Sequence, residues 1–490
     1  MAISSDEYKF RIPVFQSGIN QSTDDSLLKA YETPSAYNVN MEDGTCKSFR
    51  FPSLKNDIDD VGTIVTYYGD KPYLICFTSD AIYKIDGDTS TKVYGAFGKF
   101  ASCINYVMGS KKILICCSAG QVPLYYDGNT FTKLKNRYPK RDDNDNLTGY
   151  VDAKGVTHTS ETDVATYAPK GGSISLHYDR IWITNIPDEP NMVYYSAYDR
   201  FGIDIQNFIN PITPGIQGTM GGAKKIDTYD GTNMLCTKKV FDDLLAFKKK
   251  TIIKIWGSSP SNFSSMQLFE ANGAIAEKSI VSFNKGCLWL SNDGIWMYDG
   301  TNCTCISTKI QGILKNLTVS YAEHACGYFV NNRYYLAIPV NSSMNNNAII
   351  EFNTLTNAFM YYPNINVNSF TDLYNEVIIG ANNGVYNMFS DTGKANALFW
   401  KTPMSDVQAK NAKKIFSYIY FTGSGDGDVK FTLRTERKDA TVQIKLDGIE
   451  KIYRKKLKNK GRNFQLIIEN VNGSNIEIKG VELIYEADND

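Results

Sequence analysis

Short runs of alternating apolar and polar residues, about five to eight positions long, recur along most of the chain. A period of two is typical of half-buried β-strands, whose successive side chains point to opposite faces of a sheet. The helical spacing of i, i+3 and i+4 is convincing only in short pieces such as STKIQGILKNL (307–317). The pattern therefore predicts an all-β protein with little helix.

A repeated local unit joins these runs in pairs. An alternating strand ends in Asp-Gly, and a threonine-bearing strand follows. Because Asp-Gly supplies the positive φ angles of a two-residue type I′ turn, we expect the same compact hairpin at each copy. The predicted turn residues are Asp86, Gly87, Asp127, Gly128, Asp299 and Gly300. Asn353-Thr354 and Ser390-Asp391 stand at the turns of two looser copies.

A further strand precedes most copies, which makes each unit nearly a four-stranded meander. These preceding strands are KPYLICFTS, KKILICCSA, KGCLWLSND, NRYYLAIPV and NEVIIGANN. Repetition at roughly 35 to 50 residues is typical of propeller blades, which bury their apolar faces by packing around an axis. We therefore predict a β-propeller of four-stranded meander blades, with about five to seven blades.

The change of texture along the chain suggests three parts. Residues 1–60 are expected to form an N-terminal arm with the first strands, and residues 61–400 the β-propeller. Two polar or glycine-rich stretches, near 136–172 and near 205–225, are expected to be loop insertions that contact partners. Residues 401–490 alternate without the Asp-Gly unit and are expected to form a small C-terminal β-sandwich.

Composition narrows the function classes. The 52 basic residues balance the 52 acidic ones, so the chain as a whole is no strongly basic nucleic-acid binder. The ten cysteines lie mostly in apolar runs and are expected to be reduced core residues. No stretch of about eighteen apolar residues occurs, and the start lacks an apolar signal region. We expect a protein made in the cytoplasm and not exported by the secretory route.

The residue patterns of catalysis are not found. Only three histidines occur, and the nearest approach to a zinc pattern, Cys303 and Cys305 with His324 and Cys326, has unsuitable spacing. The recurring turn acids are more typical of structure than of a catalytic pair, and neither a nucleophile elbow nor a phosphate-binding loop appears. We therefore expect no enzyme activity, no metal and no cofactor.

One local charge cluster stands out, in KLDGIEKIYRKKLKNKGRNF. Its basic residues are expected around a hairpin: Lys451, Arg454, Lys455, Lys456, Lys458, Lys460 and Arg462. Phosphate backbones favour such clusters through counterion release, which makes a DNA contact one interpretation. A solvated sheet edge that blocks aggregation, or an ionic contact with an acidic neighbour, is the commoner use.

Three segments in order resemble one family. The first, FQSGINQSTDDSLLKAYETPSAYNVNMEDGTCKSFRFP, carries Gly18, Asn20, Ala36, Asn38, Val39, Gly44 and Arg50 in the matching places. The second, SISLHYDRIWITNIPDEPNMVYYSAYDRFGID, carries His177, Arg180, Trp182, Pro190, Tyr194 and Ser196. The third joins DDLLAFKKKTIIKIWG to NGAIAEKSIVSFNKGCLWLSNDGIWMYDG, with Gly273, Ser279, Gly294, Asp299 and Gly300. Together they resemble the β-propeller virion proteins of tailed bacteriophages, the class of tail hub and nozzle proteins.

The resemblance implies a structural virion protein in the phage tail, assembled in the host cytoplasm. It implies a ring, hexameric in the family, that extends or closes the tail and leaves a channel for DNA ejection. The implied partners are copies of the chain itself, portal or adaptor and other tail proteins, and genomic DNA in transient contact. The long polar stretch departs from the family, so hub, nozzle and head-closure roles stay open.

Two other functions fit a propeller. A carbohydrate-binding protein for receptor recognition would stack tyrosines, and tryptophans such as Trp289 and Trp296, on sugar rings. A hydrolase on a propeller scaffold is the third, and it lacks a visible catalytic constellation.

Overall fold

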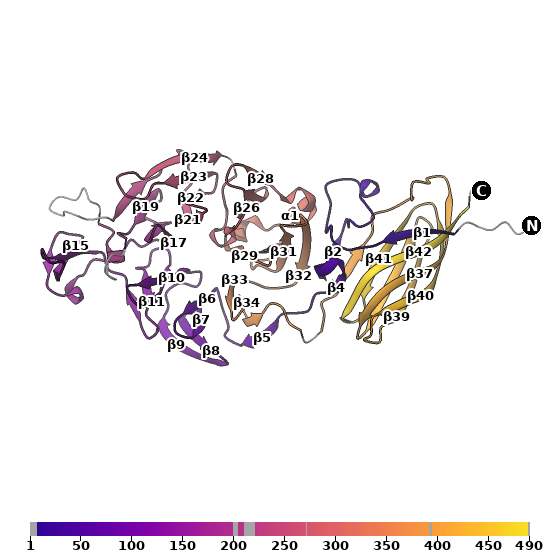
Figure 1. Ribbon diagram of the computed structural model, residues 1–490, viewed down its shortest axis with the longest axis horizontal. Coiled ribbons are helices and arrows are strands. Elements are labelled where there is room, and N and C mark those ends of the chain that lie inside the picture. The colour runs from indigo at the N-terminus through magenta and orange to yellow at the C-terminus, as the bar shows by residue number, and fades with distance from the viewer. Residues whose placement is uncertain (1–6, 199–203, 210–220, 271, 392–393, 489–490) are drawn as a thin grey trace, which may run out of the picture.

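The computed structural model describes residues 7–198, 204–209, 221–270, 272–391 and 394–488. Strands make up 53% of it and helices 6%, so the protein is all-β, as the alternation predicts. The molecule is elongated, with a ring of sheets at one end and a second group of sheets at the other (Figure 1).

The ring consists of seven four-stranded antiparallel sheets among the described residues. The first four sheets are β6 (Thr63–Tyr68), β7 (Pro72–Phe77), β8 (Ala81–Asp86), β9 (Thr89–Gly95); β10 (Ser102–Met108), β11 (Lys111–Cys117), β12 (Leu124–Tyr126), β13 (Phe131–Lys133); β17 (Ser173–His177), β18 (Arg180–Thr184), β19 (Met192–Tyr195), β20 (Gly222–Lys225); and β21 (Met234–Val240), β22 (Asp243–Lys248), β23 (Thr251–Trp256), β24 (Ser264–Glu270). The last three are β25 (Val281–Phe283), β26 (Gly286–Ser291), β27 (Gly294–Tyr298), β28 (Cys303–Cys305); β29 (Cys326–Val330), β30 (Arg333–Ile338), β31 (Ala348–Asn353), β32 (Ala358–Pro363); and β33 (Ser369–Leu373), β34 (Glu376–Ala381), β35 (Gly384–Asn387), β5 (Ser53–Asn56).

The ring is closed. The first strand of each sheet contacts the first strand of the next, and β33 of the seventh sheet contacts β6 of the first. In the seventh sheet the outer strand is β5, which comes from far upstream and pairs with β35. This arrangement is a seven-bladed β-propeller that the early part of the chain fastens to its late part.

The propeller core lies between neighbouring blades, because each second strand is covered on both faces. On β7, Tyr73, Ile75 and Phe77 pack toward the second blade, whereas Leu74 and Cys76 pack toward the seventh. Strands buried on both faces are almost continuously apolar, which explains runs such as LICF and ILICC. All ten cysteines are free thiols and seven are buried, as predicted for reduced core residues.

Two larger antiparallel sheets follow the propeller. The six-stranded sheet contains β3 (Val39–Asn40), β4 (Cys46–Ser48), β42 (Ile476–Asp488), β37 (Lys413–Gly425) and β40 (Lys451–Gly461), with β1 (Glu7–Ile12) also paired to β42. The five-stranded sheet contains β2 (Ala36–Tyr37), β36 (Phe399–Lys401), β41 (Phe464–Asn470), β38 (Asp428–Thr435) and β39 (Asp439–Lys445).

The structure divides the chain differently from the boundaries drawn on the sequence. The described part of the predicted arm, residues 7–60, is not separate, because its strands complete the two late sheets and the seventh blade. The last 90 residues likewise do not build their sheets alone, and β36 belongs to them although it begins before residue 401. Strand pairing between distant segments leaves no periodic mark in the sequence, which is why alternation alone missed it.

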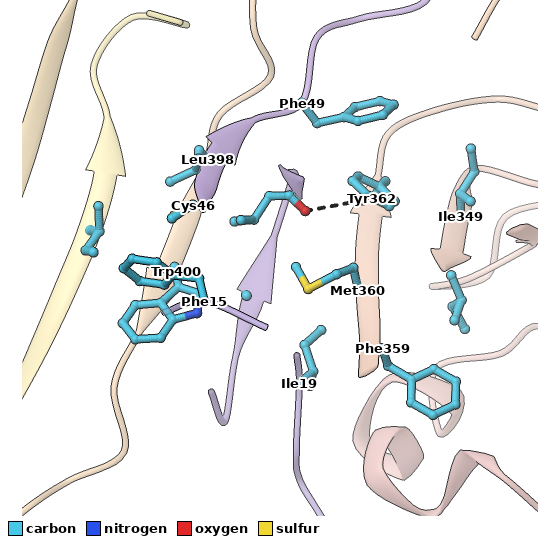
Figure 2. Packing of buried hydrophobic residues seen from close by; sticks show 14 of the residues in the cluster. Phe15, Ile19, Cys46, Phe49, Ile349, Phe359, Met360, Tyr362, Leu398 and Trp400 are labelled. Carbon is cyan, nitrogen blue, oxygen red and sulfur yellow. Dashed lines mark hydrogen bonds between the residues drawn. The ribbon is translucent and has the colours of Figure 1, made fainter. Parts of the chain in front are cut away.

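The N-terminal segment also joins the two regions through one apolar core (Figure 2). Trp400 is fully buried and packs edge-on against Phe15, with ring centroids 4.9 Å apart. Next to them, Met360 and Tyr362 of β32 extend the same cluster into the sixth blade. The Tyr362 hydroxyl donates to the carbonyl oxygen of Val39 at 3.2 Å. The propeller and the late sheets are therefore packed on a continuous core.

The polar stretch near 136–172 forms a small sheet of its own at the far end of the molecule (Figure 1). Its strands are β14 (Arg137–Arg141), β15 (Leu147–Asp152) and β16 (Thr157–His158). Arg137 is fully buried, lies 2.7 Å from Glu161 and stacks on Tyr150. Most of the second predicted insertion, near 205–225, lies outside the described residues.

Helices are short, and STKIQGILKNL is one of the few helical places, as predicted. The helical turns are α1 (Gln311–Leu314) and the 3-10 turns η1 (Asp25–Leu27), η2 (Glu42–Gly44), η3 (Glu161–Asp163), η4 (Asp204–Gln206), η5 (Glu277–Ser279), η6 (Ser307–Ile310) and η7 (Val319–His324). Within the described ranges no helix has the length and apolar character that a membrane crossing requires.

Candidate functional site

The predicted Asp-Gly turns do end paired strands, but they are not type I′ turns. That turn needs positive φ at both central residues, and no turn aspartate of the three copies has a positive φ. In the first copy Asp86 is the last strand residue, paired with Thr89, and Gly87 with φ +60° begins a two-residue loop. Glycine at the first central position fits a type II′ turn instead.

The other two copies are four-residue loops held by the aspartate side chain. Asp127 Oδ1 accepts from the N–H groups of Asn129 and Thr130, each at 2.9 Å, and Asp299 makes the same pair of contacts at 2.8 and 2.7 Å. Burial acts to raise the pKa of Asp127, but these N–H donors outweigh it and lower the pKa. The recurring acids are committed to turn geometry.

Two of the three turns meet at one cleft. Asp86 and Asp127 line a cavity of about 580 Å³ between the first and second blades, whereas Asp299 lies on the fifth. Four lysines share its lining: Lys71, Lys84, Lys111 and Lys112. The sequence repeat marked both turns, but only the packing of neighbouring blades brings them to one cavity.

Tyr73 lines this cleft, and its hydroxyl is hydrogen-bonded to the buried Tyr126 behind it. Tyr73 donates to Tyr126 at 3.0 Å, and Tyr126 donates to the Gly128 carbonyl at 2.8 Å. Burial and the bond with Tyr126 raise the pKa of Tyr73, so its phenol stays neutral. Lys84 Nζ lies 4.0 Å from the Tyr73 ring centroid and covers one ring face. The cleft can bind a polar ligand through charged groups at its rim, with little bare aromatic surface.

The predicted basic residues lie along one strand and directly after it, and not around a hairpin. Six belong to β40, and Arg462 follows it directly. β40 is 11 residues long and forms an edge of the six-stranded sheet, where β37 is its one pairing partner among the described strands. Lys451 forms an ion pair with Asp447, while Arg454, Lys455 and Lys456 are exposed. Tyr453 and Leu457 within this run are buried, whereas Ile452 is exposed.

Sequence reasoning missed a polar cluster at the end of the propeller axis where the inner strands begin. Lys278 Nζ donates to Thr63, and Lys99 forms an ion pair with Asp60. The Phe100 ring stacks on His324, with centroids 4.2 Å apart. Burial lowers the pKa of Lys278.

These groups come from four connections far apart in the chain and carry no common motif. They tie blades one, two, five and six together. No sequence signal could have revealed the cluster.

The other end of the axis is tied by Asp372 on β33. Its carboxylate accepts from the hydroxyls of Tyr68 on β6 at 2.9 Å and of Tyr328 on β29 at 3.2 Å. Burial and the bond to Asp372 raise the pKa of Tyr68 to about 12. Three adjacent blades are thereby linked through side chains, which stiffens the ring.

The middle segment of the family resemblance forms the core of the third blade. His177 pairs with Arg180 across the β17–β18 hairpin, and the buried Arg180 donates to the Ser196 carbonyl at 2.8 Å. Trp182 donates to the His177 carbonyl at 3.2 Å. These residues therefore serve the packing of this blade.

The tryptophans suggested for sugar stacking are poorly placed. Trp289 has 0% exposure and packs against Phe247, so that suggestion is wrong for this residue. Trp296 is half-buried, and its Nε1 donates to Asp293 at 2.8 Å. Among the side chains that the structure describes, no group of three or more His, Cys, Asp or Glu residues could hold a metal ion.

Comparison with known proteins gives distant structural likeness only. No family model and no curated protein matches the chain. The extracellular domain of a hybrid two component system from B. thetaiotaomicron matches with TM-score 0.40 and 12% identity over 81% of this chain, which spans about half (49%) of that chain. The Neurospora crassa Pan2 WD40 domain matches with TM-score 0.36 and 9% identity, over 70% of this chain and 97% of that one.

A third neighbour is a glycoside hydrolase family 43 arabinoxylan arabinofuranohydrolase from Bacillus subtilis, in complex with cellotetraose. It matches with TM-score 0.24 and 10% identity, over 88% of this chain and 96% of that one. Identities this low concern the fold alone, and none of the three assigns an activity.

Proposed function

We propose that the chain is a structural, non-catalytic virion protein of a tailed phage. In this proposal copies of it form a ring, hexameric by family resemblance, at a hub or nozzle position of the tail. The observation that supports a structural role is the continuous core from the propeller to the late sheets. A unit without a hinge between its two regions transmits force as one body. The phage setting rests on the three resembling segments alone.

We further infer that the two late sheets are the layers of a small β-sandwich. Phe421 of the six-stranded sheet packs on Phe431 of the five-stranded sheet, with centroids 4.7 Å apart. Phe416 and Phe10 of the first sheet likewise contact Phe464 of the second, at 4.8 and 5.0 Å. Aromatic side chains from two facing sheets are what the core of a sandwich requires.

Partner contacts are assigned in the proposal to the parts that project from the propeller. The small sheet of β14–β16 and the late sheets lie at opposite ends of the molecule (Figure 1). Neighbouring copies, portal or adaptor proteins and other tail proteins would bind there. Genomic DNA would pass through the central opening of the ring that the copies form together. Assembly would take place in the host cytoplasm, and the final location is the virion tail.

Electron microscopy of negatively stained particles tests this function. The full chain is mixed with the tail proteins encoded beside it, and with an unrelated propeller as control. Rings or tail particles that contain the chain are expected. A chain that stays monomeric in size-exclusion chromatography and is absent from every particle would overturn the proposal.

Carbohydrate recognition is the second candidate, and the cleft between the first two blades is the observation that favours it. Its lysines and aspartates could hydrogen-bond sugar hydroxyls, although the Tyr73 ring face is covered by Lys84. A glycan array with the wild-type chain and a Lys84→Ala, Asp86→Ala variant tests it. Specific sub-millimolar binding that the variant loses would favour recognition over an architectural role. Release of sugar from host polysaccharide would instead revive the hydrolase.

A further inference from the structure

We propose that the exposed edge strand β40 binds the phosphate backbone of duplex DNA, without sequence preference. The inference rests on the proposed function, in which genomic DNA passes the assembly, and it names the surface that makes the contact. The chain is neutral as a whole, but its positive charges outnumber the negative ones along β40.

Four neighbouring cations on β40 have no acidic partner among the described residues. They are Arg454, Lys455, Lys456 and Lys458, all exposed. The acids nearby are engaged elsewhere: Asp447 with Lys451, Glu450 with Lys479, and Glu482 with Lys9 and Arg11. A strand rises about 3.3 Å per residue, so the four cations span roughly 13 Å of edge. Arg454 and Lys456 lie on the face that carries Tyr420 and Tyr418, whereas Lys455, opposite Ile419, lies on the other face of the strand. Together the four cations place dense positive charge along this edge.

The strand beside them presents aromatic rings that hold the arginine in place. Arg454 lies opposite Tyr420 in register, and Lys456 lies opposite Tyr418. The guanidinium carbon of Arg454 is 4.0 Å from the Tyr418 ring centroid and 5.4 Å from that of Tyr420. Stacking on the rings orients the guanidinium at the surface and lowers the entropy lost on binding. A planar donor fork so placed matches a phosphate group.

The same stacking distinguishes duplex DNA from single strands. Single-stranded nucleic acid is bound by stacking of its bases on free aromatic faces. Here Arg454 covers Tyr418 and approaches Tyr420, so these faces are not free for bases. Duplex DNA carries one charge per about 1.7 Å of axis and rewards lysine and arginine through counterion release. Backbone contact with a duplex is therefore the partner that this chemistry fits.

Edge protection is the competing explanation, because lysines on an edge strand prevent sheet-to-sheet pairing. The two explanations differ in what charge removal does. Edge protection predicts self-association of the variant with unchanged DNA binding. Backbone contact predicts loss of DNA binding.

The test compares the full chain with the variant R454Q/K456Q/K458Q. A matched control, K92Q/K249Q/K285Q, removes three exposed lysine charges from the propeller. The probe is a fluorescein-labelled 30-base-pair duplex of mixed sequence, followed by fluorescence anisotropy at 50 and 200 mM KCl. Unfolding midpoints of all three proteins establish that each is folded.

Four phosphate contacts predict a salt slope of about −3.6, so the wild-type affinity should fall about 150-fold between the two salt concentrations. The variant should retain about one contact and lose only about fourfold over the same range, with affinity at 50 mM KCl at least roughly tenfold below wild type. The control variant should behave as wild type, and a duplex of different sequence should bind equally well.

Equal binding by wild type and variant would overturn the inference, and so would an equal loss in the control. It would also be overturned if the wild-type chain bound poly-glutamate but no duplex, because the partner would then be an acidic protein. Rings without DNA binding would remove this inference and leave the proposed function intact. DNA binding that depends on β40, without any ring of copies, would support this inference and contradict the proposed function.

Discussion

The propeller and the late sheets are both built of antiparallel strands, but they differ in which strands pair. Among the described strands, six of the seven blades are built from strands that follow one another in the chain, and the seventh includes a distant strand, β5. The two late sheets instead combine strands from both ends of the chain, such as β1 with β42 and β2 with β36. Local pairing leaves a repeat in the sequence, and distant pairing does not. The comparison explains why one region was predictable and the other was not.

The two regions also treat their sheet edges differently. Outer strands of several blades are short, such as β13 and β28 with three residues each. The edge strand β40 is 11 residues long and carries a row of lysine and arginine. Short or polar edges protect a sheet from unwanted pairing, and a long basic edge leaves a charged surface available. β40 therefore offers a charged edge that the outer blade strands do not.

The largest expected effect tests whether the two regions share one core. Trp400→Ala removes a fully buried ring next to Phe15, and it should lower the free energy of unfolding by about 3–5 kcal/mol. Differential scanning calorimetry should show one transition that moves as a whole. Trp296→Ala, in a half-buried position of the propeller, serves as control and should cost less. Two transitions, with that of the propeller unmoved, would separate the regions.

Acid should weaken the propeller through His177. Neither ring nitrogen has a hydrogen-bond partner among the described residues, and burial lowers the pKa of His177 from 6.5 to about 4. Between these values the unfolded chain binds a proton that the folded chain does not. The free energy of unfolding should therefore fall as pH decreases from 6.5 to 4, by roughly 2–4 kcal/mol in total.

Urea unfolding at pH 7 and pH 4 checks this, with His177→Gln for comparison. The variant should lose less stability between the two pH values than the wild type does. Identical pH dependence of the two proteins would mean that His177 is solvated or paired in solution.

A substitution at Gly18 tests whether the N-terminal segment packs closely against the sixth blade. Its φ is +66°, and an added Cβ would lie 2.5 Å from the Phe359 carbonyl oxygen. Gly18→Ala should cost roughly 2–3 kcal/mol from backbone strain and the collision together. Gly87→Ala is the matched control, with φ +60° and open space around the added Cβ, and it should cost about 1 kcal/mol. If both variants lost equal stability in urea unfolding, the segment would not be packed as described.

The smallest effect concerns a turn that the sequence marked. Asp127→Ala removes the acceptor for two loop N–H groups and should cost about 0.5–1 kcal/mol. Asp127→Asn keeps the acceptor and should cost less, as Asn353 makes similar contacts in the sixth blade. Since the pKa of Asp127 is lowered, the wild-type advantage is present at neutral pH and is lost as pH falls through that pKa. Equal thermal midpoints for wild type and alanine variant would contradict this role.

Particular residues show how far sequence reasoning reached at the candidate site. Asp86 and Asp127 were marked as turn residues because their unit repeats, but the type I′ assignment failed: the aspartates act as side-chain acceptors or end a strand. The basic run was found from its charge alone, whereas its place on a sheet edge beside Tyr418 and Tyr420 depends on pairing with β37. The links through Lys278 and Asp372 at the two ends of the propeller axis left no pattern in the sequence. Each joins two residues that are more than 200 positions apart in the chain.

By itself the amino-acid sequence determined the all-β class, the blade repeat and the reduced, buried cysteines. Each of these follows from local periodicity or composition, which a chain carries wherever it folds. Tertiary structure alone decided the number of blades, the closing of the ring by β5, and the sharing of one core between both ends of the chain. These depend on contacts between strands that are distant in the chain. Such contacts stabilise the fold without leaving a pattern in any single segment of the sequence.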